Sequence, residues 1–247
     1  LIGRSSNSIT ENNSDLRNKE NIILKLGNEL NNLNKTVLTS SRQTLSRILY
    51  YNEIYKNIIR KPGAIMEFGV EFGSTLSLLT KLRGIYEPYN YSRKIIGFDT
   101  FEGFTKNLDK DEKKRGWKKG DYSTPKNYEN ILEQLLTFEE KDCPINHLKK
   151  FELIKGDAST TVKKYLAENR HTLIALAIFD MDVYQPTKKV ILDIKKRLFK
   201  GSVLVFDQVN HPDFPGETAA LLESLDIKDL KMRNFHGETF GSYVILD

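Results

Sequence analysis

Short apolar runs alternate with helical patterns along most of the chain. Five of these runs predict buried strands, at residues 64–68, 94–98, 151–155, 173–179 and 201–206. Two further strands are expected near residues 227–232 and 241–246. Because strand and helix alternate throughout, the sequence predicts an α/β fold of Rossmann-like type, with a mainly parallel seven-stranded sheet and helices on both faces.

Apolar residues at spacings of three and four predict the helices between these strands. They are expected at residues 74–83, 128–138, 159–166 and 186–199, with a short helix from about residue 216. Ser159 is a candidate N-cap of the third helix, and Asp157 is the alternative cap. Pro186 suits the first turn of the fourth helix, where a missing amide hydrogen costs nothing.

The N-terminal part of the chain has a helical pattern of its own. Residues 1–14 are polar, and one apolar stripe then runs from Asp15 to Leu38, at Ile22, Ile23, Leu26, Leu30, Leu33 and Val37. The many flanking asparagines make this a poor autonomous helix, so we expect it to pack on its own domain or on a second subunit. We predict that the protein forms a homo-oligomer.

A second N-terminal helix is expected from Ser40 to about Arg60, because Ser40 and Gln43 form a capping-box pattern. Its predicted inward face consists of Leu45, Ile48, Leu49, Tyr55, Ile58 and Ile59. We therefore divide the chain into an arm at residues 1–40 and one domain at residues 41–247. Tyrosines on this second helix are expected in the core rather than at a substrate.

The stretch at residues 64–73 organises that domain. An apolar run containing Glu67 is followed by Gly69 and Gly73, which is the strand, turn and helix start of a nucleotide-binding βαβ unit. The next strand leads into Asp99, an acid placed to accept two ribose hydroxyls. Because neither G-x-G-x-x-G nor G-x-x-x-x-G-K is present, the pattern favours a nucleoside ligand without bridging phosphates, such as S-adenosylmethionine (SAM).

Acids follow most of the predicted parallel strands. They are Asp99, Asp157, Asp180, Asp182 and Asp207. Ligands of open parallel sheets bind beyond the carboxyl ends of the strands, so these side chains are expected on one edge. Carboxylates after adjacent strands can bind one hard divalent cation, and without a cation or a shared proton they would repel one another.

Composition narrows the class of protein further. With 39% hydrophobic residues in 247, the chain can bury a sizeable core. The one cysteine, Cys143, excludes an internal disulfide framework and a cysteine-rich zinc site, and we expect a cytoplasmic protein. No apolar run approaches the ~18 residues of a membrane span. The net charge of +5 is weak evidence for an anionic partner.

The segment at residues 105–150 is an insertion rich in charge. Seven basic and four acidic residues fall between Lys106 and Asp121. Loops of this length are either solvated connections or lids, so the insertion is either a solvent-exposed loop or a lid that closes over an anionic substrate.

Four phrases in this order resemble one known family. They are Met66–Gly73, Ile96–Phe104, Phe179–Thr187 and Gly201–Asp207. Over residues 41–247 they resemble the macrocin O-methyltransferase (TylF-like) family, class I SAM-dependent enzymes that methylate sugar hydroxyls. The resemblance implies a SAM-dependent O-methyltransferase whose small-molecule substrate is a sugar or a nucleotide- or carrier-linked sugar.

The resemblance also assigns roles to residues. Around SAM it places Glu67, Gly69 and Gly73 at the methionine end, Asp99 at the ribose and Asp157 near the adenine. Ser74, Thr100 and Ala158, which neighbour these residues, are also assigned to cofactor binding. The divalent-metal aspartates match Asp180 and Asp207, and the general base matches Asp182. The family usually has a second aspartate where this chain has Gln208, whose amide oxygen can still ligate magnesium with one charge fewer.

Three rival interpretations remain at this stage. Tyr184 and Lys188 spell the Y-x-x-x-K pair of short-chain dehydrogenases, although Pro186 interrupts it and the dinucleotide glycine motif is absent. The sequence pI of about 9.0 suggests an RNA methyltransferase, but no basic block outside the insertion interleaves with aromatics, so we expect no nucleic-acid partner. A scaffold built on the N-terminal helices would bind no SAM.

Overall fold

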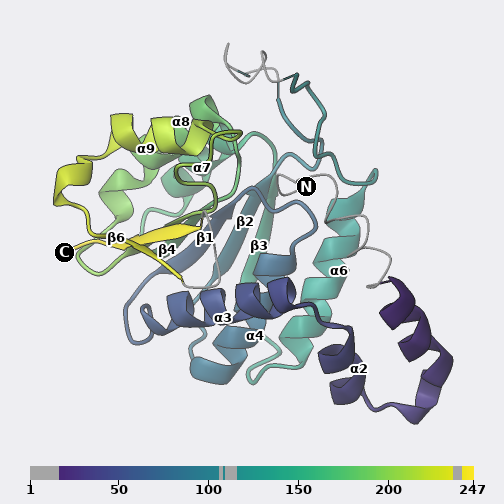
Figure 1. Cartoon of the computed structure of the whole chain (residues 1–247). Coiled ribbons are helices and arrows are strands. Elements are labelled where there is room, and N and C mark those ends of the chain that lie inside the picture. Colours follow the sequence, from purple (N-terminus) through teal and green to yellow (C-terminus); the bar gives the residue numbers. More distant parts are fainter. Residues whose placement is uncertain (1–16, 106–107, 109–115, 236–240) are drawn as a thin grey trace. The chain divides into compact units, whose positions relative to one another are not determined.

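Seven strands form one sheet in the computed structural model, which describes residues 17–105, 108, 116–235 and 241–247 (Figure 1). The strands are β1 (Ala64–Phe68), β2 (Ile95–Asp99), β3 (Phe151–Lys155), β4 (Ile174–Phe179), β5 (Val203–Phe206), β6 (Met232–Asn234) and β7 (Ser242–Ile245). Their order is β3-β2-β1-β4-β5-β7-β6. Strands β1 to β5 pair in parallel, and β7 pairs antiparallel with β5 and β6, which confirms the predicted mainly parallel sheet.

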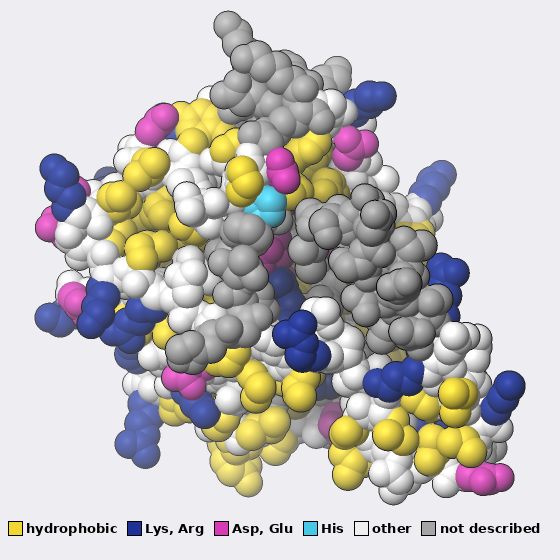
Figure 2. Space-filling view, viewed as in Figure 1, with side chains coloured by type: hydrophobic (Ala, Val, Ile, Leu, Met, Phe, Trp, Pro, Cys, Tyr) yellow, Lys and Arg dark blue, Asp and Glu magenta, His cyan; other side chains and the backbone are white. Residues whose placement is uncertain are grey.

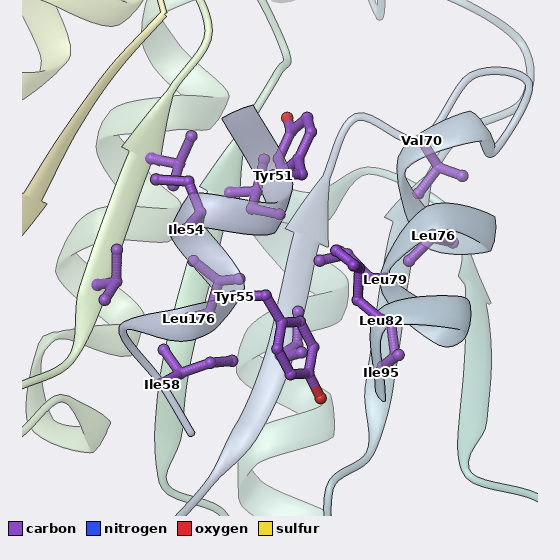
Figure 3. Close-up of a cluster of buried hydrophobic side chains, with 14 of the residues drawn as sticks. Tyr51, Ile54, Tyr55, Ile58, Val70, Leu76, Leu79, Leu82, Ile95 and Leu176 are labelled. Atoms are coloured by element: carbon purple, nitrogen blue, oxygen red, sulfur yellow. The ribbon is translucent and has the colours of Figure 1, made fainter. Parts of the chain in front are cut away.

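Helices cover both faces of this sheet. They are α3 (Arg42–Lys56), α4 (Ser74–Tyr86), α6 (Tyr128–Lys141), α7 (Ala158–Glu168), α8 (Tyr184–Ile194) and α9 (Gly216–Ser224). Buried residues of α3, α4 and α6 pack with one face of the strands, and Figure 3 shows the part of this core contributed by α3 and α4. Residues of α7, α8 and α9 pack with the other face. The alternation of side chains along each strand thus supplies two cores.

Four phenylalanines form a stacked row across the central strands, near their carboxyl ends. The phenylalanine row consists of Phe98, Phe68, Phe179 and Phe206. Neighbouring ring centroids lie 5.1, 5.6 and 4.8 Å apart, and the rings face one another in matching register across β2, β1, β4 and β5. The residue after three of these phenylalanines is an acid, so the row marks the boundary between the core and the edge of the sheet.

Residues up to Leu49 form a compact unit separate from the unit that begins at Tyr50. The arm is not the single helix predicted from Asp15 to Leu38. Residues 17–26 are helical, a 3₁₀ turn η1 follows at Gly27–Glu29, and α2 runs from Asn32 to Thr39. Gly27 has a φ of +50°, which breaks the helix.

The prediction for α3 was wrong in its cap and in part of its buried face. The hydroxyl of Ser41 accepts the amide of Thr44 at 3.0 Å and begins α3, whereas the Ser40 hydroxyl donates to Thr36 at the end of α2. Three expected inward residues, Leu45, Ile48 and Leu49, are 51, 36 and 47% exposed. The buried part of α3 begins only at the unit boundary, with Tyr50, Tyr51, Ile54 and Tyr55.

Boundaries elsewhere differ by a few residues. Ile227–Asp229 is a 3₁₀ turn (η3), so β6 starts at Met232 rather than in that segment. Helix α8 begins at Tyr184 and ends at Ile194, where a short 3₁₀ turn takes over. None of these shifts moves an acid away from the carboxyl edge of the parallel strands.

Candidate active site

Asp180 and Asp207 lie at the ends of neighbouring strands, as predicted. The backbone amide of Asp180 donates to Phe68 at 2.8 Å, and that of Asp207 donates to Phe179 at 3.1 Å. These bonds extend the sheet by one residue beyond the phenylalanine row, and both side chains are partly exposed. Figure 2 shows acidic side chains beside a histidine near the centre of one face of the molecule. The sheet therefore brings these two carboxylates to one edge.

Asp182 lies two residues beyond β4 in an unusual conformation. Its φ is +62° and its side chain is buried, with 8% of the residue exposed. A non-glycine residue in the left-handed region costs about 1–2 kcal/mol and needs surrounding contacts to hold it there. Such strain is concentrated at functional sites, and Asp182 is the predicted general base.

Glu217 is a fourth acid at this edge, and it is not among the site residues predicted from the sequence. It lies in the first turn of α9 with no exposed surface. Burial raises the pKa of Glu217 well above its ordinary value, and the charges of Asp182, Asp180 and Asp207 raise it further. An acid in the first turn of a helix is common for reasons of helix polarity alone, so its position carried no functional signal.

Gln208 contributes an oxygen that the described residues leave without a hydrogen bond. Its Oε1 atom is buried, and no donor among those residues reaches it. Within the same described part of the chain, no group of three or more His, Cys, Asp or Glu side chains could hold a metal ion.

Asp99 organises the turn that follows β1. One carboxylate oxygen accepts the amides of Val70 at 2.6 Å and Glu71 at 2.8 Å, and the other accepts the amide of Phe101 at 2.6 Å. A carboxylate offers about four acceptor positions, so these bonds leave little spare capacity for ribose hydroxyls. The predicted ribose acid thus shapes the cofactor turn directly.

The two glycines of this turn have positive φ angles that favour glycine, and Gly69 is also required by packing. Gly69 has a φ of +90°, and a Cβ there would lie 1.9 Å from the carbonyl oxygen of Asp180. Gly73 has a φ of +76°, and a Cβ there would lie 2.4 Å from Leu132 on α6. The turn after β1 therefore lies directly against the end of β4, which places the predicted cofactor turn beside the acidic edge.

The other predicted cofactor residues surround this turn. Asp157 is the N-cap of α7 and accepts the amide of Ser159 at 2.9 Å, so Ser159 is not the cap. The Thr100 hydroxyl donates to the carbonyl of Gly103 at 2.8 Å. Glu67 is buried within β1, Ala158 is buried at the start of α7, and Ser74 is exposed at the start of α4.

Aromatic side chains from two segments meet beside the acids. This aromatic cluster consists of Tyr122, Phe104, Trp117, Phe214 and His211, whose consecutive ring centroids lie 4.9–5.2 Å apart. Met181 and Val183, which flank Asp182, pack with Phe104 in the same apolar group. Burial raises the pKa of Tyr122, and the charge of Asp182 adds to that effect, so the cluster extends to Asp182.

The dehydrogenase-like pair has a local role. The hydroxyl of Tyr184 and the ammonium group of Lys188 each lie 2.5 Å from the same oxygen of Glu223. These contacts join α8 to α9 on the exposed side of the molecule. The Tyr184–Lys188 pair thus contributes to the contact between α8 and α9.

Comparison with solved structures places the chain in a family. Two crystal structures of CalS11, described as a calicheamicin methyltransferase and as a TDP-rhamnose 3′-O-methyltransferase, share 33% identity with it. They match 98% of this chain and 94 and 96% of their own, with TM-scores of 0.85 and 0.80. The chain belongs to the macrocin O-methyltransferase (TylF-like) family of class I SAM-dependent methyltransferases. It is an enzyme that uses SAM.

A structure with lower sequence identity shares the fold. The O-methyltransferase NovP is 14% identical over 81% of this chain and 79% of its own, with a TM-score of 0.58. No protein-family model matches the sequence, and a search of curated proteins gives no match. Among the described residues of this TylF-like enzyme, no helix is long and apolar enough to cross a membrane. The predicted lid at residues 105–150 lies partly outside the described residues.

Proposed function

We propose that this enzyme transfers the methyl group of SAM to a hydroxyl of a sugar or sugar-containing small molecule at the edge formed by β4 and β5. The observation that carries this proposal is the packing of Gly69 against Asp180, because it joins the cofactor turn to the acidic edge. The relative CalS11, named for a TDP-rhamnose substrate, supports a nucleotide-linked sugar as the acceptor.

In this proposal SAM is held by the turn after β1 and the ends of β2 and β3. Glu67, Gly69, Gly73 and Ser74 are assigned to its methionine end. Asp99 and Thr100 are assigned to the ribose, and Asp157 and Ala158 to the adenine. Ordering of the turn by three hydrogen bonds to Asp99 supports this assignment, because it fixes a cofactor-binding loop before the ligand arrives.

Asp182 and Asp180 are the proposed catalytic residues. The sulfonium methyl of SAM is already activated, so the protein must align a hydroxyl for in-line displacement and remove its proton. Asp182 is the proposed general base, supported by its burial, its strained backbone and its neighbouring acids. Asp180, which is more exposed and packs directly against Gly69 of the cofactor turn, is proposed to orient the acceptor.

A divalent cation such as Mg²⁺ is proposed to bind Asp180, Asp207 and Gln208. The donors are all oxygens, and the buried Oε1 of Gln208 gains a partner when a cation or a hydroxyl is present. Magnesium usually keeps several waters, so two carboxylates and an amide are a sufficient protein share. When bound, the cation would supply Lewis-acid polarisation of the acceptor hydroxyl.

The location and assembly of the enzyme are also proposals. Cys143 is buried as a free thiol, which suits a reducing compartment, and we assign the enzyme to the cytoplasm. A homo-oligomer is proposed because large apolar side chains of the arm remain exposed, among them Leu33 at 71%.

The test measures methyl transfer from SAM to a panel of TDP-linked deoxysugars, with free sugars and a short RNA as alternative acceptors. Product on a free or nucleotide-linked sugar would support the proposal, product on nucleotide-linked sugars alone would identify the acceptor class, and product on RNA would overturn it. Titration calorimetry with S-adenosylhomocysteine, with and without Mg²⁺, separates cofactor binding from acceptor choice. No heat of binding under either condition would contradict the assigned cofactor site.

A further inference from the structure

Glu217 joins two loops that carry the proposed active-site residues. Its Oε1 atom accepts the backbone amides of Met181 at 3.2 Å and Asp182 at 3.3 Å. Its Oε2 atom accepts the backbone amide of Gln208 at 3.1 Å. One side chain from α9 therefore holds the loop after β4 and the loop after β5 at a fixed separation.

The start of α9 is built for this close approach. A Cβ on Gly216 would lie 2.5 Å from the carbonyl oxygen of Asp182 and 2.6 Å from the amide nitrogen of Tyr184, so only glycine fits at that position. The carboxylate of Glu217 is consequently brought directly under the backbone of residue 182. It accepts the amide hydrogen of a residue whose left-handed conformation needs an external hold.

Holding two loops with a buried acid that lies among three other acids is energetically unfavourable. An uncompensated buried carboxyl lowers stability, and a neutral side chain of similar size would relieve the crowding of negative charge. Stability alone gives no reason for glutamate here. The requirement for two acceptor oxygens facing three backbone amides explains the glutamate. A carboxylate has two acceptor oxygens and no donor, and a protonated carboxyl group has only one O–H donor, which can rotate away.

We propose that Glu217 is a positioning residue for methyl transfer, which sets Asp182 and Gln208 at the separation that the reaction needs. This inference rests on the proposed function of the same edge. Glu217 itself does not touch the reacting atoms in this account, because both of its oxygens are occupied by backbone amides of these loops. Its effect passes through the positions of the two loops.

Glu217→Gln is the informative substitution. Its amide oxygen can keep the bonds to Met181 and Asp182, but its NH₂ group then faces the amide hydrogen of Gln208 and cannot accept it. The change therefore frees the loop after β5 and leaves the loop after β4 held. We expect kcat to fall by about tenfold or more, since small misplacements at a reacting centre have large effects. Affinity for S-adenosylhomocysteine should stay within about twofold of wild type.

Hydrogen exchange gives a readout that does not depend on activity. In Glu217→Gln the amide of Gln208 should exchange faster, while those of Met181 and Asp182 keep their wild-type rates. Glu217→Ala should accelerate all three. Glu223→Gln, on the exposed side of the same helix, is the matched control and should change none of them.

The outcomes separate the two proposals. Wild-type kcat with wild-type exchange at Gln208 in Glu217→Gln overturns the positioning role. A fall in kcat accompanied by equal losses in cofactor affinity and melting temperature also overturns it, because that pattern marks a general loss of structure. If the wild-type enzyme methylates no acceptor, the proposed function fails, and the exchange data show by themselves whether Glu217 holds the loops.

Discussion

Asp99 carries two tasks at the scale of a single residue. Its carboxylate orders the turn after β1 through bonds to Val70, Glu71 and Phe101, and the same group is the proposed ribose acid. Glu71 and Phe101 both have positive φ angles, +49° and +56°, so the turn it orders is conformationally demanding. Loss of this acid would then affect cofactor binding through the protein as well as through the ribose.

We expect Asp99→Ala to weaken binding of S-adenosylhomocysteine by at least about tenfold, because the three backbone donors that order the cofactor turn and the ribose lose their acceptor. Titration calorimetry measures the change. Glu168→Ala, an exposed acid on α7, serves as the control and should bind as wild type does. An unchanged affinity in Asp99→Ala would remove Asp99 from the cofactor site.

The proposed cation site makes a prediction about single side chains. Asp180→Asn should raise the Mg²⁺ concentration needed for half-maximal activity, and Gln208→Asp should lower it, because charge on the donors governs affinity for a hard cation. Asp182→Asn should mainly depress kcat. Activity assays over a Mg²⁺ titration distinguish these effects, and full activity in excess chelator would eliminate the cation from the mechanism.

A buried arginine ties elements together on the opposite edge of the sheet. Arg93, just before β2, donates to the carbonyls of Gly63 at 2.5 Å, Ile58 at 2.9 Å and Lys61 at 2.7 Å, and it pairs with Glu87 at 2.8 Å. These bonds satisfy backbone carbonyls in the turn between α3 and β1. The carboxylate of Glu87 is the one counter-charge among these partners.

This pair predicts a pH dependence of stability. Burial alone would raise the pKa of Glu87, but the hydrogen bond and charge of Arg93 outweigh it and lower the pKa below its ordinary value of 4.5. A pKa lowered by folding contributes stability that is present above pH 4.5 and is lost as the pH falls below it. The melting temperature of wild type should therefore fall more steeply with acid than that of Glu87→Gln. Equal slopes would contradict this assignment.

At the scale of elements, the sequence predicts features that depend on nearby residues, and it does not predict those that depend on contacts between segments distant in sequence. The strands were predictable because continuous apolar runs such as Ile174–Phe179 report burial on both faces. The acids after them were predictable because parallel strands share an edge. The exposed face of α3 before Tyr50 was not, because its periodicity is helical whether or not a partner covers it. Glu217 was missed because its role depends on how closely α9 approaches a loop 35 residues away in sequence.

At the scale of the whole molecule, the arm presents apolar side chains to solvent. Ile22, Leu33 and Val37 are 61, 71 and 62% exposed. We expect them to be covered by a second copy of the chain, because burying such a stripe is favourable at about 25 cal/mol per Å². Light scattering should give a dimer mass for the full chain and a monomer mass for a chain that begins at Ser40. Equal oligomeric states would contradict the role of the arm.

The aromatic cluster also equips the enzyme with its own optical reporter. Trp117 is the one tryptophan in the sequence, and its ring centroid lies 5.2 Å from that of Phe104 and 4.9 Å from that of Phe214. Those two neighbours belong to the segment after β2 and to the connection between β5 and α9. Tryptophan emission therefore responds to the apposition of these two segments beside the acids. Rapid-mixing fluorescence could time the arrival of cofactor and acceptor separately, without any attached dye.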